Sequence, residues 1–279
     1  MTYSVSYKFN SKPKLRSCYL LVCWNEDVGR LGTSVTDYIN EQLKSQLFCE
    51  IEPEGFFYLG GVLVEGNVAR FPESQFYCCP EKNLIIFKSH SPRSEWYKFL
   101  NMVLDITEDV CQIKELYTIG GMVALAAHTT PRRLLATENS PEMKTILSQY
   151  DLAGDMDYET PPGQRPTLSS YLLWIAKRRN IMGAALWMPV PFYLVSTGDP
   201  RATKKMVDFI NKRFELDLDL SVFDEEIHRQ NEKIARLANR FLELDDFLHK
   251  LEANVSLTDE ENSRLVQLME EHLDKENQI

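Results

Sequence analysis

The side chains best suited to bind a small anion gather around the histidine at position 128. His128 and Thr129 lie in the segment Ala-Ala-His-Thr-Thr-Pro-Arg-Arg, which ends with Arg132 and Arg133. A histidine beside two arginines is typical of an anion or phosphate site, because guanidinium groups form paired hydrogen bonds to phosphate oxygens. A histidine that hydrogen-bonds to its own loop backbone fits the same pattern without any ligand, so both interpretations stay open.

A second group of polar residues follows the first apolar run, in the segment Trp-Asn-Glu-Asp-Val-Gly-Arg-Leu-Gly. This segment links an expected strand to an expected helix, a position where doubly wound folds often bind ligands. It lacks the three spaced glycines of a dinucleotide site and the Gly-Lys-Ser/Thr ending of a Walker loop. A simple strand-to-helix turn is the alternative. The candidate ligand pocket at this sheet edge comprises Asn25, Asp27, Gly29, His128, Thr129 and Arg132.

The common signatures of catalytic centres are absent from the sequence. There is no Gly-x-Ser-x-Gly elbow, no His-Glu-x-x-His segment and no Cys-x-x-Cys pair. The six cysteines lie in or beside apolar runs, without a histidine at metal-binding spacing, and are interpreted as reduced core thiols of a cytosolic protein. We therefore predict no catalytic residues, no metal and no cofactor, and a function exerted through surfaces.

The elements that must position these residues alternate between strands and helices. A continuous apolar run over 17–24 predicts a buried central strand, helical spacing follows over 34–48, and short strands over 62–88 predict a meander. Ser91-Pro92, Ser140-Pro141 and Asp199-Pro200 mark helix starts, and further strands are expected over 114–119, 133–137 and 181–188. This order predicts a three-layer α/β/α sandwich with a mixed, mostly parallel sheet.

The last part of the chain has a different pattern. Apolar residues recur at steps of three and four from Ile227 to Val255, and a Thr258/Glu261 capping box precedes a second apolar stripe. We predict a C-terminal helical hairpin, with an α/β core domain over 1–220 and an acidic hairpin over 221–279. The expected interaction surface is Ile234, Leu237, Phe241, Leu244, Leu248 and Leu251. The two arms could equally bury this seam against each other and the core.

Charge is distributed unevenly along the chain. Residues 215–279 carry 18 acidic and 7 basic side chains, a net charge of −11, whereas the rest carries 23 acidic and 24 basic. The acidic excess on the helical tail would repel phosphates, so nucleic acid is not expected as a partner. No run of about 18 apolar residues is present, and we expect a soluble, cytoplasmic protein without a membrane partner.

Several short motifs, taken in order, resemble the proteasome assembly chaperone 2 family, in its bacterial branch. They are Trp24-Asn25-Glu26-Asp27-Val28-Gly29, Pro92 with Trp96 and Phe99, His128-Thr129-Thr130-Pro131, Pro161 to Leu173, Ala185-Leu186-Trp187, Pro191-Phe192-Tyr193 and Pro200-Arg201-Ala202. The resemblance covers about Tyr19 to Leu244. It implies a phosphorylase-like α/β fold, self-association and binding to other proteins rather than catalysis.

Two hypotheses of function follow. The first is a non-catalytic, assembly-chaperone-like protein that forms a homo-oligomer and binds another protein complex. The alternative is a small-molecule or nucleotide-related binding protein or enzyme that uses the sheet edge near His128, as fold relatives do.

Overall fold

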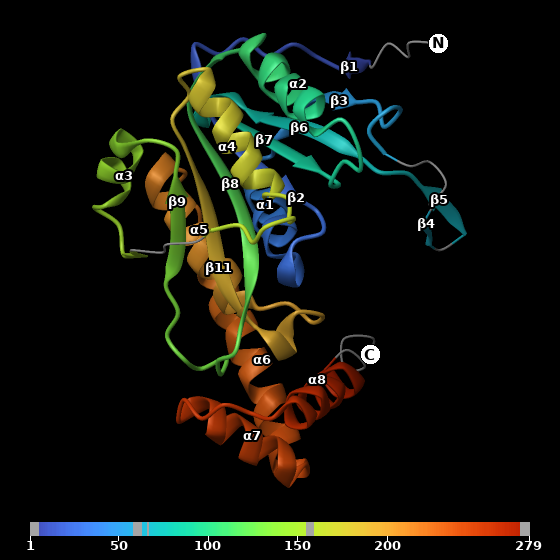
Figure 1. Ribbon diagram of the computed structural model, residues 1–279, viewed down its shortest axis with the longest axis vertical. Coiled ribbons are helices and arrows are strands. Elements are labelled where there is room, and N and C mark those ends of the chain that lie inside the picture. Colours follow the sequence, from blue (N-terminus) through green and yellow to red (C-terminus); the bar gives the residue numbers. More distant parts are fainter. Residues whose placement is uncertain (1–5, 58–62, 66, 155–158, 274–279) are drawn as a thin grey trace. The chain divides into compact units, whose positions relative to one another are not determined.

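A computed structural model describes residues 6–57, 63–65, 67–154 and 159–273 of the 279-residue chain (Figure 1). The chain divides into two compact units. The sheet unit comprises Met1–Glu26, Thr36–Ile119 and Leu135–Leu186, and the tail unit comprises Asp27–Val35, Gly120–Leu134 and Trp187–Ile279. Each unit therefore contains segments that are far apart in the sequence.

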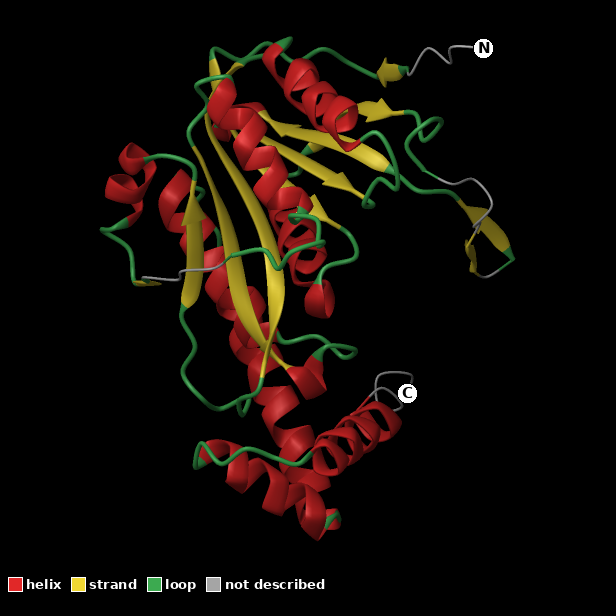
Figure 2. Cartoon of the chain, viewed as in Figure 1, coloured by secondary structure: helices red, strands yellow, loops and turns green. Residues whose placement is uncertain are grey.

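Strands and helices alternate along most of the chain (Figure 2). The strands are β1 (Tyr7–Phe9), β2 (Ser17–Trp24), β3 (Gln46–Ile51), β4 (Leu63–Glu65), β5 (Val68–Arg70), β6 (Ser74–Cys79), β7 (Leu84–Ser89), β8 (Gln112–Ala124), β9 (Leu134–Glu138), β10 (Leu152–Ala153) and β11 (Gly183–Pro191). The helices are α1 (Leu31–Gln42), α2 (Trp96–Glu108), α3 (Pro141–Leu147), α4 (Leu168–Arg178), α5 (Pro200–Phe214), α6 (Ser221–Arg240), α7 (Leu242–Glu252) and α8 (Asp259–Leu273). Short 3-10 turns lie at Val28–Arg30 (η1), Pro80–Lys82 (η2) and Phe192–Leu194 (η3).

The main sheet has nine strands in the order β1-β3-β6-β7-β2-β8-β11-β9-β10. Strand β2 pairs in parallel with both neighbours, so that Leu20 lies opposite Ile85 on β7 and Leu116 on β8. The pairs β1–β3, β3–β6 and β6–β7 are antiparallel, as the expected meander requires. The predicted α/β fold with a mixed sheet is confirmed.

The core of the sheet unit lies on both sides of β2 and β7. Leu20, Leu21, Val22 and Cys23 are consecutive and fully buried. Side chains on a strand alternate between faces, so burial at successive positions means that both faces are covered. The continuous apolar run over 17–24 therefore predicted a central strand correctly. Figure 1 shows α2 and α4 side by side over the sheet.

The helix predicted over 34–48 is wrong in its second half. Helix α1 ends at Gln42, and Leu47 and Phe48 belong to strand β3. Lys44 adopts a left-handed backbone with φ 50°, which ends helical geometry. Residues 46–51 then pair with both β1 and β6, so hydrogen bonds of the sheet outweigh the local helical spacing.

The start predicted for the next helix is also displaced. Helix α2 begins at Trp96, after Glu95 in a left-handed conformation with φ 53°. Ser91 does not cap the helix, because its backbone N–H and its hydroxyl both donate to Glu26 Oε2, at 2.9 and 3.0 Å. By contrast, Ser140 and Asp199 cap α3 and α5 as predicted.

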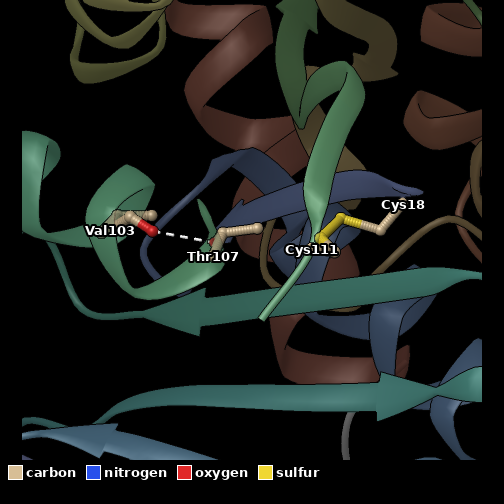
Figure 3. The surroundings of a disulfide bond; sticks show 4 residues. All are labelled: Cys18, Val103, Thr107 and Cys111. Atoms are coloured by element: carbon tan, nitrogen blue, oxygen red, sulfur yellow. Dashed lines mark hydrogen bonds between the residues drawn. A yellow bond between two sulfur atoms is a disulfide. The ribbon is translucent and has the colours of Figure 1, made fainter. Parts of the chain in front are cut away.

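A disulfide joins Cys18 at the start of β2 to Cys111, three residues beyond the end of α2 (Figure 3). The prediction that all six cysteines are reduced is therefore wrong for this pair. The residues are 93 positions apart, so no sequence motif shows that they are neighbours in the fold. Cys23, Cys49, Cys78 and Cys79 are buried and lie outside this disulfide.

The C-terminal tail is helical, as predicted, but it contains three helices rather than two arms. The first expected arm is divided at Phe241, whose extended backbone (φ −121°, ψ 99°) separates α6 from α7. The capping box that opens α8 is present: the Glu261 N–H donates to Thr258 Oγ1 and the Thr258 N–H donates to Glu261 Oε2.

Within the tail unit, α6 is fastened to the segments that precede it. Lys204 on α5 forms an ion pair with Asp224 on α6 at 2.5 Å, and Gln230 Nε2 donates to the Gly198 carbonyl oxygen at 2.9 Å. The domain boundary after residue 220 stays a prediction. No helix in the described part of the chain is long and apolar enough to cross a membrane.

Candidate functional site

The turn after β2 is closed by the carboxylate of Asp27. Asp27 Oδ2 accepts hydrogen bonds from the backbone N–H groups of Gly32, at 3.0 Å, and Gly121, at 2.8 Å. The carboxylate thus ties η1 and the start of α1 to strand β8. Gly29, inside this turn, has φ 70°, which glycine adopts without strain.

The close approach of this turn to β8 depends on Gly121. A Cβ atom at this position would lie 2.1 Å from the carbonyl oxygen of Val28. No side chain is compatible with that distance, so the Gly-Gly pair of β8 allows backbone to lie directly on backbone. This explains the glycine pair at the sheet edge in structural terms.

The second oxygen of Asp27 has no such partners. Oδ1 is buried and makes no hydrogen bond within the described residues. Burial raises the pKa of the Asp27 carboxyl to about 6, against the opposing effect of the two glycine N–H groups on Oδ2. A proton on Oδ1 would reduce the cost of burying this charge, so the carboxyl is poised to change its protonation just below neutral pH.

His128 is held by Tyr193, from the turn η3. The backbone N–H of His128 donates to the Tyr193 hydroxyl oxygen at 2.6 Å, and the same hydroxyl lies 2.9 Å from His128 Nδ1. The hydroxyl satisfies both contacts when it accepts from the N–H and donates to Nδ1, which leaves the ring proton on Nε2. Burial lowers the pKa of His128 to about 4, so the ring is neutral at pH 7.

Arg132 is engaged by groups of its own chain. Its Nη1 donates to the carboxylate of Asp199 and, at 2.8 Å, to the Pro189 carbonyl oxygen, and Nη2 approaches the His128 carbonyl oxygen at 3.4 Å. The two charged side chains are 4% and 1% exposed. Asp199 Oδ1 also accepts from the N–H groups of Arg201 and Ala202 at the start of α5.

This arrangement leaves little of Arg132 for a ligand. An anion would have to displace Asp199, which neutralises the guanidinium and caps a helix with the same carboxylate. Only Nε is buried without a partner among the described residues. The chemistry of the pair is therefore best suited to holding the 127–133 loop against η3 and α5.

Thr129 links the same loop to the helical tail. Its hydroxyl donates to Glu252 Oε1 on α7 at 2.7 Å, across 123 positions of sequence. Together with the Gln230 bond, this contact places polar links between the α/β part of the tail unit and its terminal helices.

The predicted pocket residues fall into separate groups. His128, Thr129 and Arg132 are brought together in one loop, and Asp27 and Gly29 share the turn η1. Asn25 belongs to the sheet unit, where its Nδ2 lies 3.4 Å from His90 Nδ1. Within the described residues no hydrogen bond joins Asp27 to His128.

Sequence reasoning missed Tyr193 and Asp199 as members of this network. Tyr193 lies in a motif that carries the family resemblance and Asp199 directly precedes another, but they are 65 and 67 positions from their partners. Pairing the three motifs around His128, Tyr193 and Asp199 as one cluster would have required the fold.

The residues predicted as an interaction surface lie mostly inside the tail. Ile234, Leu237, Leu244, Leu248 and Leu251 are buried, and Phe241 is half-buried with its ring 4.9 Å from that of His272. Leu265, Leu268 and Met269 of α8 are buried in the same unit. These apolar side chains therefore pack within the tail unit, and their role as an interaction surface stays a prediction.

A hollow of about 110 Å³ lies elsewhere in the tail unit. It is lined by Leu125, Leu251, Asn254, Val255, Ser256, Leu257 and Asn262, and so includes none of the predicted pocket residues. No group of three His, Cys, Asp or Glu side chains able to hold a metal occurs among the described residues.

The fold and the polar network define an α/β protein whose loops and helical tail are joined by polar side chains. A model of the PAC2 family matches residues 25–238. The chain therefore belongs to the PAC2 family. Among proteins with curated annotation, none is similar enough to count as a match.

Solved structures of similar fold include proteins from bacteria and archaea. A Corynebacterium glutamicum protein of unknown function superposes with a TM-score of 0.73 at 18% identity, over 89% of this chain and 96% of that chain. A proteasome-assembly chaperone homologue from Mycobacterium tuberculosis gives 0.67 at 15%, over 82% and 99%. PbaB, an archaeal proteasome activator from Pyrococcus furiosus, gives 0.66 at 18%, over 84% and 98%. At these identities the likeness shows the fold.

Proposed function

We propose that this chain is a non-catalytic, assembly-chaperone-like protein that self-associates and binds another protein complex. The observation that carries the proposal is that the side chains best suited to bind a ligand are already bonded to other residues of the same chain. His128 and Arg132, which could have bound an anion, are consumed by Tyr193 and Asp199 and hold loops in place. The role of His128 and Arg132 in this proposal is to stabilise the fold and not to bind or convert a ligand.

Two further observations support this proposal. The fold is shared with structures described as a proteasome-assembly chaperone homologue and an archaeal proteasome activator. The tail carries a net charge of −11, which is a large electrostatic surface for a basic partner. A cytoplasmic location belongs to the same proposal.

The first test is the molar mass of the purified full chain by light scattering at micromolar concentration. The expected result is a discrete mass that is a multiple of the 32.4 kDa chain. A monomer at all concentrations would contradict self-association. Oligomers of protein chains are commonly closed and symmetric, so a broad, concentration-driven series of masses would also count against a defined assembly.

A small-molecule binding protein is the second candidate, favoured by one observation. Asp27 has a buried oxygen without a hydrogen-bond partner in the described structure, beside a strand-to-helix turn. Calorimetric titration with nucleosides and with inorganic phosphate tests this candidate. Heat that saturates in the wild type and disappears in Asp27→Asn would favour it over the first proposal.

A further inference from the structure

Three aromatic rings form a continuous row across α2 and α4, with an arginine at each end. The ring centroids of Trp96 and Tyr171 are 6.5 Å apart, and those of Tyr171 and Trp174 are 5.5 Å apart. Arg165 lies 6.0 Å from the Trp96 ring, and Arg178 lies 4.9 Å from the Trp174 ring. We call this set the aromatic row; all of it belongs to the sheet unit.

The aromatic row is partly exposed to solvent. Trp174 is 46% exposed, Trp96 and Tyr171 are half-buried, and Tyr97, next to Trp96 on α2, is 55% exposed. The residues of the same helices that cover the sheet, such as Phe99 and Leu172, are completely buried. Each helix therefore has an inner apolar face that is buried and an outer face whose aromatic rings are only partly covered by the described residues of the sheet unit.

The two helices that carry the row are fastened to each other. Arg179, at the end of α4, donates to Asp105 at 2.6 Å and to Glu108 at 2.7 Å, both on α2. It also donates to the side-chain oxygen of Asn101 at 2.5 Å. Preformed surfaces bind with a smaller entropy cost, so this fastening suits the row to recognition.

The surroundings of the row are basic. Arg165 and Arg178 form no ion pair with a carboxylate in the described part of the chain, and Asp105 and Glu108 are taken by Arg179. The neighbouring charges in sequence are Arg93, Lys98 and Lys177, against Glu95. Trp, Tyr and Arg are the residue types that contribute most to binding energy in protein interfaces.

We propose that the aromatic row docks the described part of the acidic helical tail, residues 215–273, of a second copy of this chain. The inference rests on the proposed self-association and names the two surfaces that meet. Two aromatic rows brought together by a twofold axis would place like charges opposite one another, which is unfavourable. The tail offers the complementary charge, with 16 acidic against 6 basic side chains over these residues.

Exposed carboxylates of the tail include Glu225 and Glu260, which have no ion pair among the described residues, and Glu270. Carboxylates of this kind accept paired hydrogen bonds from arginine, and the rings supply apolar area beside them. Because the row and the tail are different surfaces, the contact is head-to-tail, and the discrete mass expected above requires it to close into a ring.

The test compares light-scattering masses of full-length variants. Trp174→Ala and Arg178→Glu should each raise the dissociation constant of the oligomer by about tenfold or more. Lys44→Glu, an exposed charge change in the turn after α1, is the matched control and should leave the mass unchanged. Circular dichroism melts show whether the variants are folded, and Trp174→Phe, which keeps an aromatic ring, should retain most of the association.

A tail variant identifies the occupant. Glu225→Lys, Glu260→Lys and Glu270→Lys combined should weaken association in the same way. A wild-type oligomer that survives both Trp174→Ala and Arg178→Glu would overturn this inference and leave self-association standing. A change in the row variants without any change in the tail variant would exclude the tail as occupant. Quenching of Trp174 emission by a single-stranded oligonucleotide would overturn it in favour of nucleic acid.

Discussion

The Tyr193 hydroxyl contacts His128 twice, once at the backbone N–H, 2.6 Å away, and once at Nδ1, 2.9 Å away. The two residues are both buried, so neither contact can be replaced by water without rearrangement. One phenol oxygen therefore fixes the position and the protonation of the histidine that the sequence presents as the most reactive candidate.

Replacing Tyr193 by phenylalanine should lower the free energy of unfolding by about 1–3 kcal/mol, because a buried N–H and a buried ring nitrogen lose their partner. Urea denaturation followed by circular dichroism measures the effect. Tyr97→Phe is the control, since that side chain is exposed, and it should change stability by less than about 0.5 kcal/mol. Equal effects of the two substitutions would contradict the role given to Tyr193.

The Arg132–Asp199 pair should respond strongly to the loss of one member. Arg132→Met leaves a buried carboxylate without its counter-ion and should cost about 3–5 kcal/mol. Asp199→Asn keeps a helix-capping oxygen but removes the charge. The double variant should lose less free energy of unfolding than the sum of the losses in the two single variants. A double-mutant cycle measured by urea denaturation gives this difference. Additive effects would indicate that the pair is not coupled.

Protonation of Asp27 and of His128 should change the free energy of unfolding in opposite directions as the pH falls from 7 to 5. The pKa of folded Asp27, about 6, is above its ordinary value of 3.8, so its destabilising effect is present at pH 7 and decreases as protons bind. The pKa of folded His128, about 4, is below 6.5, so the stability that it contributes is lost as pH falls from 6.5 towards 4.

Asp27→Asn should therefore make the protein lose about 1–2 kcal/mol more stability between pH 7 and pH 5 than the wild type does. Urea midpoints measured at both values provide the comparison. Asp37→Asn, which removes an exposed carboxylate, serves as the control for a change of charge. An identical pH dependence in the wild type and Asp27→Asn would show that Asp27 titrates in its ordinary range.

The disulfide predicts a simple thiol count. Alkylation of the denatured, unreduced chain should modify four cysteines, and reduction before alkylation should raise the number to six. Mass spectrometry of the intact chain separates the two results. Six modified cysteines without reduction would mean that Cys18 and Cys111 remain thiols, and Cys111→Ser would then leave the count of reactive groups lower by one.

Local pattern was sufficient for the parts of the fold in which burial and secondary structure coincide. Strand β2 and the caps at Ser140 and Asp199 could be predicted because their physical causes lie within a few residues. The end of α1 could not, since residues 46–51 are a strand only through pairing with β1 and β6. Where the local spacing of apolar residues favours a helix and distant strands offer hydrogen bonds, tertiary pairing determines the secondary structure.

The sequence was sufficient to select residues of the candidate site such as His128 and Arg132, but not to predict what those residues do. His128 and Arg132 lie in one loop, as the segment suggested. Their partners Tyr193 and Asp199, however, follow strand β11 much later in the chain. A sequence shows which side chains could bind a ligand. Whether those side chains are already bonded within the chain depends on residues more than 60 positions away in the sequence.

The absence of a side chain at Gly121 sets a limit on how this protein can vary. Any larger residue would push against the Val28 carbonyl oxygen at 2.1 Å and would move the N–H that Asp27 holds. In a library of all single substitutions this position should tolerate almost nothing, although it contributes no side chain to any contact. A single hydrogen atom is thus what the fold requires where β8 passes beneath the turn.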